Sequence, residues 1–280
     1  MNFFQAFMLG VLQGATEFLP VSSSGHLVLF PWFLGWSPPS LAFDTVVHWG
    51  TMVAVIAYFW RDWVALVRAA WQSIRESIQQ RSWATTDPQA RLAWWIVVAT
   101  IPAALVGYLW EDFFEALFSR PVAAASLLLV TALLLALSEH LGNPHRAHKR
   151  DLTTLSGWEA LLIGCAQALA IFPGISRSGA TIAAGLLRGL ERTAAARFSF
   201  LLATPIILGA GLLSVGDLVG SGEIAAQATI LIVGFLAAAI SGFACISFLM
   251  RYLQTRRLYP FAIYCALLAI FGLLRAWLMS

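Results

Sequence analysis

The sequence of 280 residues has little charge, and this excludes a soluble globular domain. Only 11% of the residues are Asp, Glu, Lys or Arg, whereas 60% are apolar. Soluble domains carry about 25% charged residues, because their surface has to be hydrated. Lysine is nearly absent, since Lys149 is the only one, and the net charge is a thinly spread +3. We therefore expect no nucleic-acid partner.

Cysteine is also scarce. Cys165, Cys245 and Cys265 lie in apolar stretches, with no Cys-x-x-Cys pair and no histidine to complete a metal site. This pattern excludes a disulfide scaffold and predicts three buried free thiols.

Long runs without charge dominate the chain instead. They lie at 18–43, 92–110, 121–138, 160–176, 198–216, 224–250 and 258–274. About 20 helical residues cross a hydrocarbon core of ~30 Å, so most of these runs are long enough to span a bilayer. They are apolar on every face, unlike the alternating strands of a membrane barrel. The sequence predicts an all-α polytopic membrane protein, with clear spans near 41–60, 92–110, 121–138, 198–216, 225–248 and 259–279.

The basic residues indicate an orientation. Arginine is concentrated in segments 61–91, 139–157 and 251–257, whereas 111–119 and 216–223 are acidic. Because loops rich in Lys and Arg stay in the cytoplasm, the first three segments are predicted to be cytoplasmic and both chain termini external.

One clear span, 198–216, lies between the cytoplasmic segment 139–157 and the external segment 216–223. The stretch 158–192 must therefore cross the membrane twice or enter and return on the same side. Its centre contains Pro173, Gly174 and Arg177, which do not suit a lipid-exposed helix. Irregular backbone at membrane depth must be buried in protein or line a wet cavity. We therefore predict a re-entrant helical hairpin with this motif at its tip.

The N-terminal stretch, about 3–34, repeats the pattern of that hairpin at an offset of 154 residues. The matches are Ala6, Gly10, Gln13, Phe18, Ser22, Ser24 and Gly25 with Ala160, Gly164, Gln167, Phe172, Ser176, Ser178 and Gly179. A hairpin followed by three spans in each half predicts inverted repeats at 1–138 and 158–280, joined by a cytoplasmic linker at 139–157.

The two tips together carry an unusual set of polar groups. The first supplies Gln13 and Glu17 on one helix face, then Ser22, Ser23, Ser24, Gly25 and His26. The second supplies Ser176, Arg177, Ser178, Gly179 and Thr181. Arginine binds phosphate through two N–H groups, helix N-termini attract anions, and histidine titrates near neutral pH. The set suits an anionic group that changes charge during a reaction.

A purely structural interpretation is the alternative. Serine, threonine and glycine often serve close packing in membrane helices, and Glu17 could simply neutralise Arg177. Their joint occurrence at two Pro/Gly tips favours a functional site.

Five segments resemble bacterial undecaprenyl-diphosphate phosphatases of the BacA/UppP family. The two longest are Gln13–His26 (QGATEFLPVSSSGH) and Pro173–Thr181 (PGISRSGAT), and the others are 43–51, 198–205 and 260–264. The resemblance covers nearly the whole chain. It implies inverted repeats with re-entrant hairpins, and removal of the terminal phosphate of undecaprenyl diphosphate, which recycles the cell-wall carrier lipid and gives bacitracin tolerance.

The resemblance also implies the setting of the reaction. The expected cofactor is a divalent cation, Mg²⁺ or Ca²⁺, and the expected partners are a polyprenyl diphosphate lipid and the bilayer. The expected location is the bacterial inner membrane, with the site opening to the outer face. The sequence is compatible with a homodimer.

By the same resemblance, the expected catalytic residues are Glu17, Ser23, His26 and Arg177. Arg177 would stabilise the phosphoryl oxygens, and His26 would be the general acid or base. Glu17 would orient His26 or bind the cation, and Ser23 matches the family's reactive serine, with an activated water as the competing nucleophile. Substrate-binding roles are expected for Gln13, Ser22, Ser24, Gly25, Ser176, Ser178, Gly179 and Thr181.

Three further positions complete these expectations. Gln13 stands where many family members have a glutamate, which argues against a metal site with two carboxylates. Asp44 and His48, four residues apart in a span, also match the family. We interpret them as support for the structure or for the substrate path.

Two other functions share part of this pattern. An inverted repeat could transport or flip the same lipid, and release of phosphate by the purified protein would distinguish the two. Phosphatidic-acid phosphatases also contain Ser-Gly-His and Ser-Arg elements. They require an upstream Lys-x6-Arg-Pro motif, which is missing around Lys149.

Overall fold

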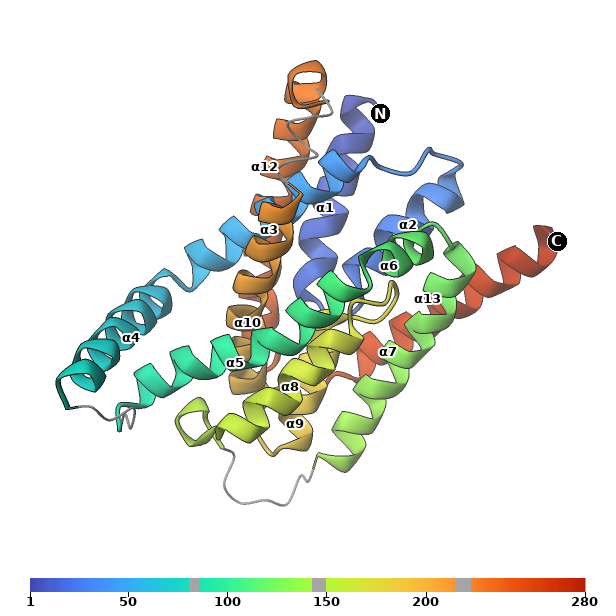
Figure 1. The fold of residues 1–280 in the computed structure, drawn as a ribbon. Coiled ribbons are helices and arrows are strands. Elements are labelled where there is room, and N and C mark those ends of the chain that lie inside the picture. Colours follow the sequence, from blue (N-terminus) through green and yellow to red (C-terminus); the bar gives the residue numbers. More distant parts are fainter. Residues whose placement is uncertain (81–85, 143–149, 215–222, 280) are drawn as a thin grey trace.

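The computed structural model describes residues 1–80, 86–142, 150–214 and 223–279, and these residues form helices without a β-strand (Figure 1). The helices are α1 (Phe3–Phe18), α2 (Ser23–Leu34), α3 (Leu41–Tyr58), α4 (Trp60–Gln80), α5 (Pro88–Leu109), α6 (Glu111–Phe118), α7 (Pro121–Leu141), the 3₁₀ turn η1 (Leu152–Thr154), α8 (Gly157–Leu169), α9 (Arg177–Leu187), α10 (Arg192–Leu213), α12 (Glu223–Tyr252) and α13 (Tyr259–Met279).

Six helices in the described residues are long and apolar enough to cross a membrane. They are α3, α5, α7, α10, the Gln227–Tyr252 part of α12, and α13. Each coincides with one of the spans expected from the charge-free runs. The predicted all-α polytopic membrane fold is confirmed.

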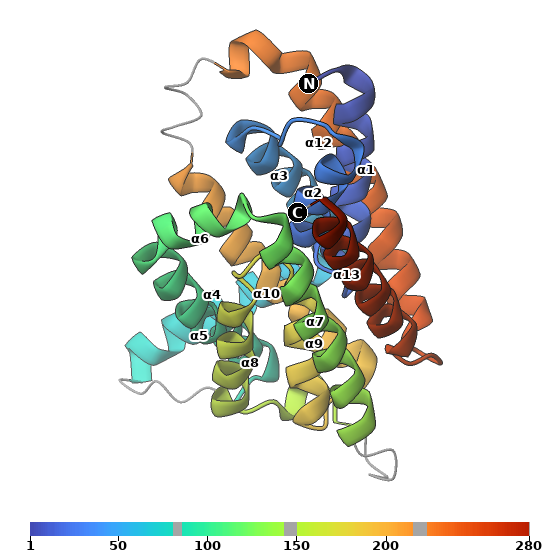
Figure 2. The same ribbon diagram turned by 90° about the vertical axis from the view of Figure 1, so that its right-hand side faces the viewer.

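The pairs α1–α2 and α8–α9 form the two predicted helical hairpins (Figures 1 and 2). Their helices contain 16, 12, 13 and 11 residues. At 1.5 Å per residue they are about 17–24 Å long, which is short of the ~30 Å hydrocarbon core. Each hairpin can therefore enter the membrane without crossing it.

Each hairpin packs through a glycine against a span from the other half of the chain. A Cβ at Gly10 of α1 would lie 2.5 Å from the carbonyl oxygen of Gly234 on α12, and a Cβ at Gly164 of α8 would lie 2.7 Å from Cα of Ala99 on α5. These close approaches require glycine, as is common between membrane helices. Gly10 and Gly164 correspond at the repeat offset, but the inverted repeat as a whole stays a prediction.

Two ion pairs fix the helix ends on either side of the second hairpin. The Glu139 carboxylate of α7 accepts two hydrogen bonds from Arg192 of α10, at 2.8 and 2.5 Å, and one from the Leu258 N–H before α13. Arg150 donates to both Glu159 oxygens, at 2.7 and 3.0 Å, which fixes the start of α8. The second hairpin is thus anchored at its base.

Three expectations need correction or lie outside the structure. Segments 61–91 and 111–119, expected as loops, contain the helices α4 and α6. Cys165 is exposed and Cys245 half-buried, so only Cys265 is the buried thiol expected. A charge-free run does not distinguish a lipid-facing position from a core position. The linker at 139–157 and the acidic segment 216–223 lie partly outside the described residues.

Candidate active site

The two hairpin tips end in the same helix cap. Ser22 Oγ accepts a hydrogen bond from the N–H three residues on, at 3.2 Å, and Ser176 Oγ does the same at 3.0 Å. In both caps the serine two residues after the capping serine, Ser24 or Ser178, places its hydroxyl 3.2 Å from the capping oxygen. A capping serine satisfies one N–H of the first helical turn. The first turn of α2 and the first turn of α9 are therefore ordered in the same way.

The tips contact each other directly. Ser178 Oγ donates to the carbonyl oxygen of Leu19, at 3.1 Å, and a Cβ at Gly25 would lie 3.2 Å from Cα of Gly174. Thr131 of α7 secures the second tip, because its hydroxyl donates to the Gly174 carbonyl and accepts from the Ser176 N–H, both at 2.8 Å. A Cβ at Gly25 would require its neighbours to shift by a few tenths of an ångström, and the close approach of the tips brings the polar residues of both hairpins together.

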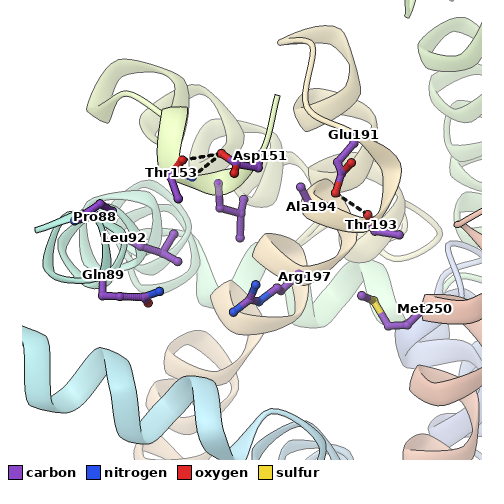
Figure 3. A pocket seen from close by; sticks show the side chains of 11 residues that line it. Pro88, Gln89, Leu92, Asp151, Thr153, Glu191, Thr193, Ala194, Arg197 and Met250 are labelled. Carbon is purple, nitrogen blue, oxygen red and sulfur yellow. Dashed lines mark hydrogen bonds between the residues drawn. The ribbon is translucent and has the colours of Figure 1, made fainter. Parts of the chain in front are cut away.

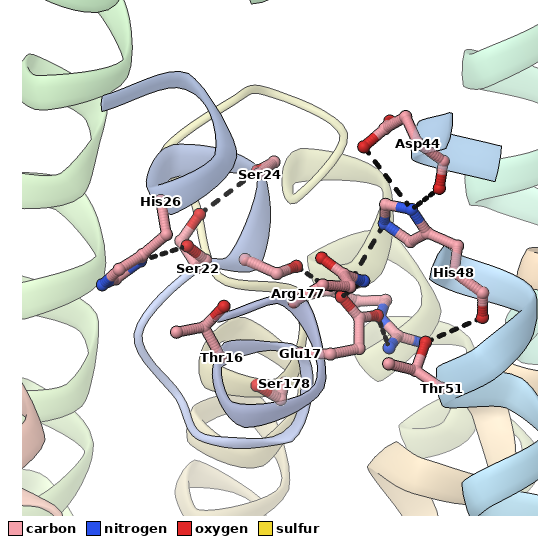
Figure 4. A network of polar contacts seen from close by, with 12 residues as sticks. Thr16, Glu17, Ser22, Ser24, His26, Asp44, His48, Thr51, Arg177 and Ser178 are labelled. Atoms are coloured by element: carbon pink, nitrogen blue, oxygen red, sulfur yellow. Dashed lines mark hydrogen bonds and ion pairs between the residues drawn. The ribbon is translucent and has the colours of Figure 1, made fainter. Parts of the chain in front are cut away.

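Glu17 is the centre of the polar cluster where the tips meet (Figure 4). Its carboxylate is 6% exposed, and Arg177 NH2 donates to Oε1 at 2.5 Å. Oε2 accepts from the Ser23 hydroxyl and from Gln13 Nε2, the latter at 3.1 Å. Glu17 could thus accept the proton of Ser23 while Arg177 neutralises the other oxygen. A buried charge is stabilised by this kind of paired and hydrogen-bonded arrangement.

Two polar atoms in the cluster have no partner among the described residues. They are Arg177 NH1 and Gln13 Oε1, both buried. An unpaired buried donor or acceptor costs about 1–3 kcal/mol, which a ligand that bonds to these atoms would recover. Arg177 NH1 can donate to a phosphoryl oxygen, and Gln13 Oε1 can bind a cation or a hydroxyl group.

His26 and His48, the two histidines near the tips, differ in the group that lies next to Nε2. In both rings Nδ1 donates to the carbonyl oxygen four residues earlier, at 2.7 Å for His26 and 2.8 Å for His48. His26 Nε2 lies 2.7 Å from the Tyr264 hydroxyl, whereas His48 Nε2 points at Glu17 Oε2, 3.9 Å away. Because Nδ1 carries the proton in each neutral ring, Nε2 is an acceptor. No group of the described residues donates a hydrogen bond to Nε2 of His48.

His26 faces away from Glu17 and Arg177 in Figure 4, toward the side where α7 and α13 lie. Its side chain is fully buried and its ring stacks on that of Tyr264. Ser22, whose carbonyl oxygen accepts the hydrogen bond from His26 Nδ1, has a φ of 70°, which is unfavourable for a residue with a side chain. His26 therefore holds the strained residue that precedes Ser23. The expectation that Glu17 orients His26 is not supported, because both ring nitrogens bond elsewhere.

The structure gathers four of the expected site residues, Gln13, Glu17, Ser23 and Arg177, at one point. The hydroxyls of Ser22, Ser24, Ser176, Ser178 and Thr181 contact other groups of the protein, and Gly25 and Gly179 donate to the caps. Substrate-binding roles for these seven stay predictions. The structure places His48 near Glu17, and the role expected for it from its spacing and its match to the family, support for the structure or the substrate path, stays a prediction. Asp44 Oδ1 lies 3.8 Å from His48 Nδ1.

No group of three or more His, Cys, Asp and Glu side chains gathers as a metal site in the part of the chain that the structure describes. The donors at the tips are the Glu17 carboxylate and the free Gln13 amide oxygen. Oxygen donors of this kind suit Mg²⁺ or Ca²⁺, which commonly bind through one or two carboxylates and substrate phosphates. The site chemistry is therefore compatible with such a cation.

A cavity of about 250 Å³ lies away from this cluster, between the starts of α5 and α10 (Figure 3). Its polar lining consists of residues that were not expected at the site: Gln89, Asp151, Thr153, Glu191, Thr193 and Arg197. Arg197 is already paired with Asp62 of α4. The cavity contains no group that the polar cluster uses.

Comparison with known proteins shows what the chain is similar to. The family model of the bacitracin resistance protein BacA matches residues 6–271. An undecaprenyl-diphosphatase of Rubrobacter xylanophilus is 46% identical over 263 residues, which cover 93% of either chain. One of Desulforudis audaxviator is 43% identical over 270 residues, or 96% of either chain, and one of Trichlorobacter lovleyi is 42% identical over 283 residues, the whole of both.

Proposed function

Because the chain belongs to the family of the bacitracin resistance protein BacA, we infer that it is an integral-membrane undecaprenyl-diphosphate phosphatase. It hydrolyses undecaprenyl diphosphate to undecaprenyl phosphate and inorganic phosphate. This activity returns the carrier lipid to cell-wall synthesis and gives bacitracin tolerance. The six candidate spans agree with a multi-pass enzyme that meets its lipid substrate within the bilayer.

The hydrogen bond from Ser23 to Glu17 is the observation that carries the proposed mechanism. Ser23 Oγ attacks the terminal phosphorus and Glu17 takes its proton, so that the bond to the bridging oxygen breaks and undecaprenyl phosphate leaves. Water then attacks the phosphoserine, Glu17 gives its proton to Ser23 Oγ as the bond from this oxygen to phosphorus breaks, and the phosphate leaves with the two protons of the water. Arg177 turns its unpartnered NH1 to the phosphoryl oxygens throughout.

Direct attack by water remains the competing route. In that route Glu17 activates the water, and Ser23 only donates a hydrogen bond. The two routes differ in one product: only attack by Ser23 forms a phosphoenzyme. Trapping of a phosphoserine in the wild-type protein supports the covalent route.

His48 is our choice for further proton transfer, because its Nε2 is open and faces Glu17. The side chain of His48 is 27% exposed, whereas that of Glu17 is 6% exposed. His26, the general acid or base expected from the sequence, is fully buried with both ring nitrogens bonded. We assign His26 the role of holding Ser22 and hence of positioning Ser23.

A divalent cation, Mg²⁺ or Ca²⁺, is proposed as the cofactor. Glu17 and the Gln13 amide oxygen would hold it together with the substrate phosphates. When bound, it would neutralise negative charge on the phosphate oxygens.

The membrane arrangement is proposed from the arginine distribution. Segments 61–91, 139–157 and 251–257 face the cytoplasm of a bacterial inner membrane, both termini are external, and the site opens to the outer face. An impermeant thiol reagent should not label a cysteine placed near Arg150 in intact cells. A homodimer is compatible with this arrangement, and the mass of the purified particle tests it.

The decisive experiment measures phosphate release from undecaprenyl diphosphate by the purified protein, with and without EDTA. We expect release that EDTA abolishes and that added Mg²⁺ or Ca²⁺ restores. A folded protein that moves the lipid but releases no phosphate would be a transporter. Release that resists EDTA would remove the cation from the mechanism and leave the phosphatase intact.

A further inference from the structure

Helix α4 displays an apolar stripe that no part of the described chain covers. The exposed residues Trp60, Val64, Val67, Trp71 and Ile78 follow one another at intervals of three, four or seven residues. At 3.6 residues per turn these intervals place all of them on one side of the helix. The stripe is a continuous surface and not a set of scattered side chains.

A different side of α4 makes the contact with the rest of the protein. Leu66, Ala69 and Ser73 are buried, and Ser73 Oγ accepts a hydrogen bond from the Trp94 indole of α5 at 3.1 Å. With 100° of rotation per residue, these three lie roughly 120–180° around the helix from the stripe. The stripe is therefore not the edge of the α4–α5 interface.

A row of arginines runs beside the stripe. Arg61, Arg68 and Arg75 are seven residues apart and lie roughly 60–100° around the helix from the apolar residues, so they line one margin of the stripe. Helix α4 contains two acidic residues, Asp62 and Glu76, and Asp62 is already paired with Arg197 of α10. An apolar stripe with basic residues along its margin matches the acyl region and the phosphates of an anionic bilayer.

The position of α4 in the chain favours the same occupant. Phe59 alone separates α4 from α3, a candidate membrane span that ends at Tyr58. A helix that starts one residue after a span begins at the bilayer surface, where Trp60 and Trp71 suit the interface. A second copy that packed through the same stripe would place another row of arginines against this one, and the acidic segment 111–119 is predicted to lie on the opposite side of the membrane.

We propose that α4 docks on the membrane through Trp60, Val64, Val67, Trp71 and Ile78, and that Arg61, Arg68 and Arg75 bind the headgroups of anionic lipids. This inference is independent of the proposed chemistry at the hairpin tips. Because α4 continues from α3, the docked helix also fixes the end of the span that carries Asp44 and His48.

Spin labels in the full-length protein test the proposal. Cys165, Cys245 and Cys265 are replaced by alanine, and single labels are attached at Val67→Cys or Ile78→Cys on the stripe. Gln72→Cys and Glu76→Cys, at exposed positions roughly 110–150° around α4 from the stripe, are the matched controls. In vesicles of phosphatidylcholine and phosphatidylglycerol, stripe labels should collide often with oxygen and rarely with a water-soluble nickel chelate. The control labels should show the reverse.

The arginines are tested through the label at Val67. Arg68→Gln with Arg75→Gln should raise its exposure to the nickel chelate, whereas Arg256→Gln with Arg257→Gln, on the turn before α13, should not. Each arginine at an anionic surface is worth about a fivefold change in binding. Equal nickel accessibility at Val67 and Gln72 would overturn the proposal. So would dipolar broadening between labels of two molecules, because a second copy would then cover the stripe.

Discussion

The two hairpins share a scaffold but differ in chemistry. Both tips are capped by a serine that bonds the N–H three residues on, and both hairpins pack through a glycine on a span from the other half. At the repeat offset, however, Glu17, Ser23 and His26 of the first hairpin correspond to Ile171, Arg177 and Ala180 of the second. The caps are duplicated, whereas the acid and the hydroxyl come from one hairpin and the guanidinium from the other.

This division has a physical advantage. A carboxylate and a guanidinium on one short hairpin would neutralise each other locally. On separate hairpins they meet only when the tips pack together, as Glu17 and Arg177 do at 2.5 Å. The site is then assembled by tertiary contacts, and its charges are desolvated only when they are paired.

The largest expected effect comes from removing the reactive group of the first hairpin. Ser23→Ala should lower kcat by at least roughly 10³-fold if Ser23 forms the phosphoenzyme, because no other hydroxyl contacts Glu17 in the described residues. Phosphate release and phosphoserine trapping measure this, with Ser247→Ala on α12 as a control. A loss of only tenfold to a hundredfold in the folded variant would favour direct attack by water.

The contribution of the second hairpin is tested by Arg177→Lys. Lysine keeps the positive charge but loses the planar fork, so the ion pair and the contact of NH1 with the phosphoryl group cannot both form. We expect kcat to fall by roughly 10²–10³-fold, as when one donor to a developing oxyanion is removed. Arg188→Lys, at the other end of α9, is the control. Wild-type activity in folded Arg177→Lys would make Arg177 a structural ion.

The two histidines separate proton transfer from positioning. His48→Gln should lower kcat by roughly 10²-fold and flatten the pH–rate profile, because glutamine cannot accept a proton at Nε2. His26→Gln should also lower activity but keep the shape of the profile, since its loss loosens Ser22. If His26→Gln abolishes one limb of the profile and His48→Gln does not, the two roles must be exchanged.

Gln13 and Gln167, which correspond at the repeat offset, differ in their hydrogen bonds. Gln13 donates to Glu17, whereas the amide of buried Gln167 has no partner in the described residues. Gln167→Leu should therefore raise the free energy of unfolding by about 1–2 kcal/mol and leave phosphate release unchanged. Thermal unfolding in detergent checks the first expectation. A destabilised Gln167→Leu would mean that the amide is hydrated in the membrane.

The smallest effect is expected where the cation would bind. Gln13→Glu should retain or raise activity and tighten cation binding, because it adds a carboxylate beside Glu17. Titration of phosphate release with Mg²⁺ after EDTA treatment measures the change. Complete loss of activity in a folded Gln13→Glu would show that a second carboxylate is harmful, and the proposed cation site would then have to be revised.

Much of the site could be predicted because its pattern is local. The Pro/Gly tips and the charge-free runs around them indicated where the polar residues sit, and Glu17 and Arg177 stood out as intramembrane charges that need partners. The partners of the histidines were not predictable in this way. Tyr264 is 238 residues from His26, and no local spacing relates the two.

The sequence by itself determined the six spans, the two hairpins and the set of polar groups at their tips, since hydropathy and helix-breaking residues act over a few turns of chain. Only the tertiary structure decided that His48, and not His26, faces Glu17, and that α4 is a helix whose apolar stripe lies opposite its contact with α5. The reason is physical. Two helices with the same hydropathy can present either side to a neighbour, and the side is chosen by close packing at residues such as Gly10 and Gly164.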